Sequence, residues 1–192
     1  MTKSFGEHET ELIRHSLIEA CKQCWNRFGY RRTGVRELAQ MANISVGAFY
    51  RFYDSKEMLF LATAGEYQEE LVTLFHESMR KSPDKHGVAD GLRAMSAVMA
   101  QQPWLAGMRE DWPVIARKLP PGYIEQDFHG DVVRIDSIVA QYGLTPRVSV
   151  ETATRIIDIL LTSVNQVGDM VPGETAAAAD FIIDSVVDKL FE

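Results

Sequence analysis

The chain has 192 residues, 46% of them hydrophobic and 24% charged, and carries a net charge of −7. These proportions are those of an ordinary folded protein, and no apolar run reaches the roughly 20 residues that a membrane-spanning helix needs. The first residues lack the apolar stretch of a secretory signal peptide, so we expect a cytoplasmic protein with no membrane part.

The first predicted helix covers residues 7–28 and ends at Gly29. Its apolar residues, among them Leu17, recur at helical spacing and form one stripe. Cys21 and Cys24 lie in this stripe, and they cannot complete a four-ligand zinc site because no second pair or suitably spaced histidine follows. We interpret them as small core residues, and a redox-sensing pair is the alternative.

Two short helices joined by a tight turn are predicted next. Residues 35–42 place apolar side chains at i, i+3, i+4 and i+7, which is one face of a helix. Asn43 tolerates the left-handed conformation that ends such a helix, and Ser45 can cap a second helix over residues 46–52. Two short helices around a tight turn form a helix–turn–helix.

The second of these helices exposes an unusual surface. Gly47 and Ala48 leave its first turn nearly bare, which suits close contact with another surface. Tyr50 and Arg51 follow, and they can reach phosphate oxygens or base edges. Lys56 begins the next helix, where free backbone N–H groups and the helix dipole favour a phosphate. The segment therefore combines a helix that can enter a DNA groove with a phosphate contact beside it.

The charge of this segment differs from that of the whole chain. Residues 22–56 contain seven Lys or Arg side chains and two acidic ones, a balance of +5, which leaves −12 for the remainder. A basic module on an acidic body favours binding of phosphate through one face only. Nucleic acid is therefore a plausible partner despite the negative net charge.

This region contains the runs TGVRELA at 33–39, ANISVGAFY at 42–50 and FYDSKEML at 52–59. These three runs resemble the amino-terminal DNA-binding domain of the TetR family of bacterial transcriptional regulators. The resemblance covers about residues 10–60 and departs from the family pattern at Gly34, where a capping Thr or Ser is common, and at Asn43, where Gly is common. Both replacements suit their positions, so the fold is unaffected, but a hydroxyl contact to phosphate is lost at Gly34 and Thr33 is its nearest substitute.

The resemblance and the local chemistry together predict the residues that contact double-stranded DNA. Val46, Gly47 and Ala48 would approach base edges, and Tyr50, Lys56 and Thr33 would hold phosphates. The full predicted set is Thr33, Arg36, Ser45, Val46, Gly47, Ala48, Tyr50, Arg51 and Lys56.

The rest of the chain is predicted to be helical as well. The apolar patterns and the Pro and Gly breaks give helices over 56–82, 88–101, 104–118 with an interruption near Pro113, 123–142, 149–170 and 175–191. The fold class is therefore all-α. A three-helix, helix–turn–helix DNA-binding domain over 1–55 precedes a larger helical effector-binding and dimerisation domain over 56–192.

The second domain carries two expected interfaces. Aromatic and methionine side chains of its middle helices have the composition of an adaptable apolar pocket, although plain core packing is the alternative. The candidate ligand-binding residues are Met95, Met99, Trp104, Met108, Trp112 and Phe128. The resemblance further implies a homodimer held by the two carboxy-terminal helices.

The functional hypothesis is a TetR-like transcriptional regulator, a repressor that a small apolar or amphipathic effector releases from its operator. The sequence has no glycine-rich phosphate loop and no metal-ligand spacing, so we expect neither an enzyme nor a cofactor or metal. The alternative is a helical interaction or redox-sensing protein that uses Cys21 and Cys24 and binds no specific DNA sequence.

Overall fold

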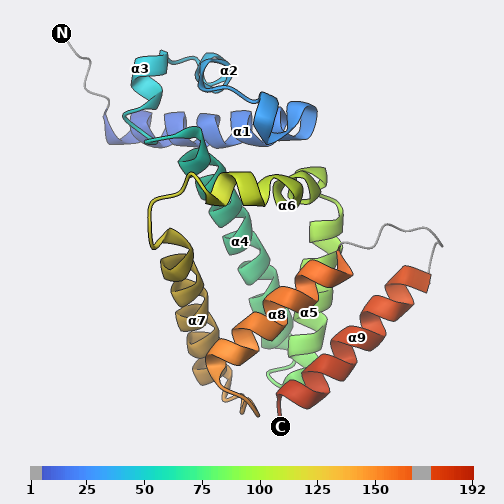
Figure 1. Ribbon diagram of the computed structural model, residues 1–192. Helices are drawn as coiled ribbons and strands as arrows, with labels where there is room; N and C mark the ends of the chain where they lie inside the picture. The colour runs from blue at the N-terminus through green and yellow to red at the C-terminus, as the bar shows by residue number, and fades with distance from the viewer. Residues whose placement is uncertain (1–5, 166–173) are drawn as a thin grey trace. The chain divides into compact units, whose positions relative to one another are not determined.

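The computed structural model describes residues 6–165 and 174–192, and leaves out the side chains of residues 103 and 106–109. In this part of the chain every regular element is a helix, and the only extended pairing is an isolated bridge between Pro146 and Phe191. The helices, drawn in Figure 1, are α1 (Glu7–Arg32), α2 (Val35–Met41), α3 (Val46–Phe49), α4 (Lys56–Lys81), α5 (Lys85–Ala100), α6 (Pro103–Ala116), α7 (Tyr123–Tyr142), α8 (Val150–Val164) and α9 (Glu174–Leu190). The all-α prediction is confirmed.

The helices pack as two compact units. Unit 1 comprises Met1–Gln68 and Pro103–Pro120, and unit 2 comprises Glu69–Gln102 and Pro121–Glu192. Helix α4 begins in unit 1 and ends in unit 2, and α6 belongs to unit 1. The sequence predicts two domains, divided at residue 55 by function. The two units are divided by packing, so the functional division stays a prediction.

Unit 1 is built around α1. Helices α2 and α6 pack against α1, and α3 packs against α2 (Figure 1). The core of the unit draws on all of its helices, with buried residues that include Leu17, Leu38, Phe49, Phe60 and Ile115. The apolar stripe predicted for the first helix therefore faces the core.

Helix α1 extends beyond the glycine at which the sequence predicts its end. Gly29 adopts φ 72° and ψ 169°, which is not helical, but a further turn from Tyr30 to Arg32 follows it. Glycine accepts this positive φ without a clash. The prediction that the helix ends at Gly29 is thus wrong, because α1 continues to Arg32. The helical backbone is nevertheless broken at this glycine.

Side-chain caps explain where three later helices begin. The Ser55 hydroxyl accepts the N–H of Met58 at the start of α4, and the Ser149 hydroxyl accepts the N–H of Thr152 at the start of α8. Asp84 accepts the N–H groups of residues 86 and 87, so α5 begins at Lys85, three residues earlier than predicted. The carboxylate cap outweighs the loop-forming composition around it.

Two other predicted boundaries change. Helix α6 continues through Pro113, so the predicted interruption there is wrong; the proline lies near the end of the helix, where one missing backbone bond disturbs few others. Helix α8 ends at Val164, capped by Asn165, and residues 166–170 of the longer predicted helix lie outside the described part of the chain.

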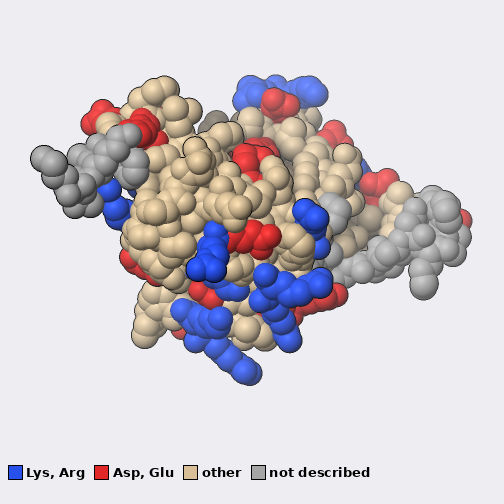
Figure 2. Space-filling model, turned by 90° about the horizontal axis from the view of Figure 1, so that it is seen from above, with Lys and Arg blue, Asp and Glu red and all other residues tan. Residues whose placement is uncertain are grey.

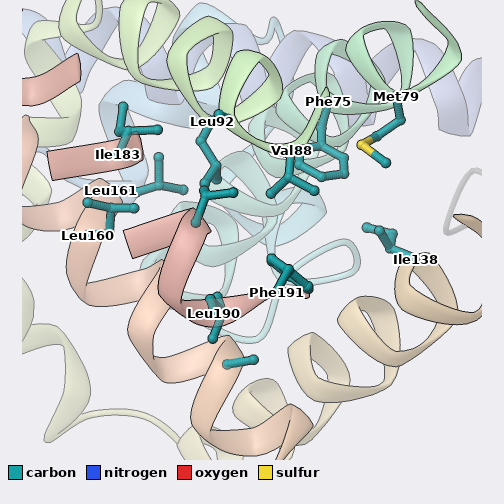
Figure 3. Close-up of a cluster of buried hydrophobic side chains, with 13 residues drawn as sticks. Phe75, Met79, Val88, Leu92, Ile138, Leu160, Leu161, Ile183, Leu190 and Phe191 are labelled. Atoms are coloured by element: carbon teal, nitrogen blue, oxygen red, sulfur yellow. The ribbon is translucent and has the colours of Figure 1, made fainter. Parts of the chain in front are cut away.

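Unit 2 has a separate hydrophobic core. Helix α5 packs against α8 and α9, α7 packs against α8, and α8 packs against α9. Figure 3 shows side chains of these helices and of α4 meeting in one cluster. The labelled members are Phe75, Met79, Val88, Leu92, Ile138, Leu160, Leu161, Ile183, Leu190 and Phe191.

Within the described residues, none of the helices is both long and apolar enough to span a membrane. No group of three His, Cys, Asp or Glu side chains in that part of the chain is placed to hold a metal ion.

Candidate nucleic-acid interface

The turn between α2 and α3 has the geometry that the sequence predicts. Asn43 adopts φ 54°, in the left-handed region, and its N–H donates to the carbonyl of Gln40 at 3.1 Å. The N–H of Ile44 donates to the carbonyl of Ala39 at 2.9 Å. This pair of bonds is a Schellman motif, which closes the end of a helix and reverses the chain. The prediction of a left-handed asparagine is confirmed.

Helix α3 is shorter than predicted. The Ser45 hydroxyl accepts the N–H of Ala48 at 3.1 Å, which confirms the predicted cap, but the α-helix ends at Phe49 instead of residue 52. The chain continues as tight turns, in which the N–H of Arg51 donates to Ala48 and that of Phe52 to Phe49. The four-residue helix is held in place by Phe49, whose side chain is fully buried.

The outer surface of α3 consists of small or exposed side chains. Val46 is 40% exposed and Tyr50 is 53% exposed. A Cβ added at Gly47 would meet only the Ser45 hydroxyl, at 3.9 Å, so the bare first turn has open space in front of it. The arrangement leaves this turn free to approach another surface closely.

Basic residues of the segment are not equally available. Arg36 and Arg51 are exposed. Arg31 donates to the carboxylate of Asp111 at 3.1 Å, and Lys22 pairs with Glu19 at the same distance. Figure 2 shows Lys and Arg side chains gathered mainly in one part of the face that it displays. The effective charge of the region is therefore lower than the +5 that the sequence contains.

A surface hollow of about 350 Å³ lies between α2 and α3. Its walls are formed by Arg36, Ala39, Gln40, Asn43, Ile44 and Val46. Gln40 and Asn43 are not among the contact residues predicted from the sequence, although Gln40 lies one helical turn from Arg36. Side-chain amides can bond to base edges, so we add both as candidate contact residues to those predicted from the sequence.

Thr33 is placed differently from the prediction. Its side chain is 1% exposed, and its hydroxyl donates to the carbonyl of Gly29 at 2.8 Å. Its N–H is directed to the carbonyls of Gly29 and Tyr30. Thr33 thus closes the end of α1, and in this conformation it offers no donor to a phosphate.

Lys56 also contacts the end of α1. Its ammonium donates to the carbonyls of Tyr30 at 2.9 Å and Thr33 at 2.8 Å, and lies 4.1 Å from the centre of the Tyr30 ring. Partial burial lowers the pKa of Lys56 below its usual value, and Lys118 adds to this effect. An ammonium has three N–H donors, so one remains for another acceptor.

A polar cluster of Tyr30, Glu57 and Lys118 beside Lys56 was not predicted from the sequence; Tyr30 and Glu57 are buried, and Lys118 is exposed. The Tyr30 hydroxyl donates to the carboxylate of Glu57, and the Lys118 ammonium donates to the Tyr30 hydroxyl at 2.9 Å and to Glu57 at 3.1 Å. Lys118 follows α6 and lies 88 positions from Tyr30. No local pattern signals a contact at such a separation.

The candidate ligand-binding residues are distributed over both units. Trp104 is buried in unit 1, where its ring lies 5.4 Å from those of Trp25 and Tyr67, and Trp112 belongs to the same unit. In unit 2, Met95 and Met99 pack against the hydrophobic core, and Phe128 lies under the guanidinium of Arg155 at 4.5 Å. The side chain of Met108 lies outside the described part. The pocket made of these residues stays a prediction.

Cys21 and Cys24 are free thiols buried in unit 1, in agreement with a core role. Burial raises the pKa of Cys21 to about 12 against an opposing hydrogen bond with Thr63, and burial also raises the pKa of Cys24. The thiolate is the reactive form of cysteine, so this environment disfavours the redox-sensing alternative.

Comparison with known proteins finds a family to which this region is similar. Residues 17–63 match the family model described as bacterial regulatory proteins, tetR family. A transcriptional repressor of Mycobacterium tuberculosis, Rv1474c, is 30% identical over 106 residues, which are 55% of this chain and 50% of the relative. The repressor AcnR of Corynebacterium diphtheriae is 29% identical over 98 residues, or 51% and 47%. The chain spans about half the length of these relatives.

Solved structures share the fold over nearly the whole chain. The fatty acid degradation regulator FadR of Bacillus halodurans superposes with a TM-score of 0.65 at 18% identity and covers 96% of each chain. The repressor FadR of Thermus thermophilus, solved in complex with lauroyl-CoA, gives 0.63 at 19% identity over 91% and 92%.

Proposed function

Since the helix–turn–helix of this chain belongs to the TetR family of bacterial regulatory proteins, we propose that the chain is a DNA-binding transcriptional regulator. It acts as a repressor, in the cytoplasm and without a catalytic step. The observation that carries this proposal is the surface of α3. Its anchor, Phe49, is buried, whereas Val46, Gly47 and Tyr50 are exposed.

The contacts follow from the chemistry of these side chains. Val46 and Ala48 meet thymine methyl groups in the major groove, and the bare turn at Gly47 lets the helix approach the base edges. Tyr50 and Lys56 bond to phosphates, and Arg36 and Arg51 reach either phosphates or bases. Ser45 contributes as the cap that orients the helix.

A homodimer reads the operator. One short helix contacts few base pairs, so specific binding needs two half-sites about 34 Å apart and a two-fold dimer. We assign the dimer interface to α8 and α9, which carry exposed apolar side chains at Ile159, Phe181 and Ile182. Apolar surface of this kind on a folded chain marks an interaction site.

A small apolar or amphipathic molecule releases the repressor. The support is the aromatic and methionine composition of Met95, Met99, Trp104, Met108, Trp112 and Phe128, together with the amphipathic lauroyl-CoA in one structure of similar fold. A coupling of about 1–3 kcal/mol between effector and DNA lowers operator affinity roughly 5- to 150-fold.

The test is selection of duplexes from a random pool, followed by affinity measurement with fluorescence anisotropy. We expect a two-fold symmetric site, and we expect Gly47→Glu to abolish specific binding, because a carboxylate in front of α3 meets the phosphates and base edges. Gly47→Ala is the matched control, since the space at this position admits a Cβ. Failure to enrich any duplex, or specific binding retained by Gly47→Glu with an unchanged circular dichroism spectrum, would overturn the proposal.

A further inference from the structure

We propose that Lys118 is a positioning residue of the DNA-binding surface, because through Tyr30 and Glu57 it holds the last turn of α1, which bears the acceptors of Lys56. The inference rests on the proposed function and adds a part of the chain outside the helix–turn–helix to its DNA-binding machinery.

The first step concerns the break in α1. The non-helical backbone at Gly29 interrupts the helical geometry between the preceding part of α1 and the turn Tyr30–Arg32. A turn that follows such a break needs other contacts to hold its orientation. Among the side-chain contacts of this turn, two involve the α6 region: Lys118 donates to the Tyr30 hydroxyl, and Arg31 donates to the carboxylate of Asp111.

The second step concerns the cluster that forms the first tether. Tyr30 is 1% exposed and Glu57 is 6% exposed, so the carboxylate is shielded from water. Burial alone would raise the pKa of Glu57, but the hydrogen bond from Tyr30, the backbone N–H of Glu57 itself and the ammonium of Lys118 together more than offset it and hold the pKa below its usual value. Lys118, whose side chain is 52% exposed, contributes positive charge to this buried carboxylate from the surface.

The third step connects the cluster with Lys56. Two of the three N–H donors of Lys56 bond to the carbonyls of Tyr30 and Thr33, and its ammonium rests on one side of the Tyr30 ring. These contacts fix the direction in which the remaining donor points. A shift of Tyr30 would thus move the phosphate contact of Lys56, and Lys118 opposes that shift.

The experiment compares Lys118→Met with Arg117→Met on the selected duplex, over a series of salt concentrations. Arg117 is the neighbouring residue and is exposed as Lys118 is, so its replacement removes the same charge and leaves the Tyr30 cluster intact. We expect Lys118→Met to bind about tenfold more weakly than Arg117→Met and to lower the salt slope by about one further charge, since Lys56 loses its placement. Tyr30→Phe should change binding in the same direction.

A second measurement separates positioning from a general structural effect. In a Lys56→Ala background, Lys118→Met should weaken binding no more than Arg117→Met does, because the contact that it positions is already absent. Lys118→Arg, which keeps the charge and the donors, should bind as the wild type does. If Lys118→Met does not fold, Tyr30→Phe in the presence and absence of Lys56→Ala gives the same comparison.

The outcomes distinguish this inference from the proposed function. A wild-type chain that selects no duplex contradicts the function itself. A wild-type chain that binds, with Lys118→Met equal to Arg117→Met, contradicts only the positioning role. The positioning role would also be contradicted if Lys118→Met weakened DNA binding equally in the wild-type chain and in the Lys56→Ala chain.

Discussion

At the scale of single residues, burial decides which chemistry a side chain keeps. Cys21, Thr33 and Glu57 are all polar or reactive groups, and the structure buries each of them. The Thr33 hydroxyl donates to a backbone carbonyl, and the Glu57 carboxylate accepts a hydrogen bond from Lys118 within the fold. The type of a residue suggests which contacts it can make, but its side chain must be exposed to make them with a partner.

Cys21 gives a prediction about stability and pH. Its thiol has a pKa of about 12 in the folded chain and 9.0 as the reference value for the unfolded chain. The folded state therefore holds its proton longer, so this contribution to stability is complete below pH 9 and is lost as the pH rises toward 12. From Cys21 we expect the free energy of unfolding to fall by roughly 1 kcal/mol between pH 8 and pH 10.

Urea unfolding of the wild type and of Cys21→Ala at both pH values measures this effect. The variant should be less stable at pH 8, because it leaves a small cavity, and the difference from the wild type should shrink at pH 10. A difference that stays constant with pH would mean that the thiol is not protected from ionisation.

At the scale of elements, periodicity and capping residues predicted which helices form, but they did not predict every helix end correctly. Asn43 and Ser45 have the predicted conformation and cap, because both depend on neighbours within a few positions. The start of α5 and the end of α3 depend on which of several local hydrogen bonds forms. The sequence pattern does not show which of these bonds is stronger.

Close packing of α5 on α4 gives a second prediction. A Cβ at Gly91 would lie 2.5 Å from the ring of Phe75, a core side chain. We expect Gly91→Ala to destabilise the fold by roughly 1–3 kcal/mol, because the ring or the helix must move.

Gly65→Ala is the matched control for this substitution. Gly65 lies within α4 with nothing within 4 Å of the added Cβ, so alanine there should stabilise the helix by roughly 0.5–1 kcal/mol. Thermal unfolding of both variants gives opposite shifts if the packing argument holds. A stabilising Gly91→Ala would show that α5 and α4 are farther apart in solution.

At the scale of the whole molecule, the proposed regulator depends on pairing of two chains. Phe181 on α9 is 73% exposed in the single chain, a large cost unless a partner covers it. We expect Phe181→Asp to convert a dimer into a monomer in light scattering, and to reduce operator affinity at least about tenfold, because one half-site alone then binds.

Leu12→Asp is the control for the dimer test. Leu12 is also an exposed apolar residue, but it lies on α1 of unit 1, whereas the proposed interface helices belong to unit 2. The mass of the Leu12→Asp chain in solution should equal that of the wild type. A Phe181→Asp chain that stays dimeric would move the interface away from this part of α9.

Much of the protein follows from the sequence by itself: the all-helical fold, the turn at Asn43, the cap at Ser45 and the bare surface at Gly47. These features depend on residues a few positions apart, whose geometry is nearly independent of the rest of the chain. Only the tertiary structure decided that Thr33 is buried, that Lys56 bonds to the end of α1, and that Lys118 reaches Tyr30 across 88 positions. The reason is physical: such contacts arise when separate helices pack, and packing brings together side chains whose spacing in the chain has no period.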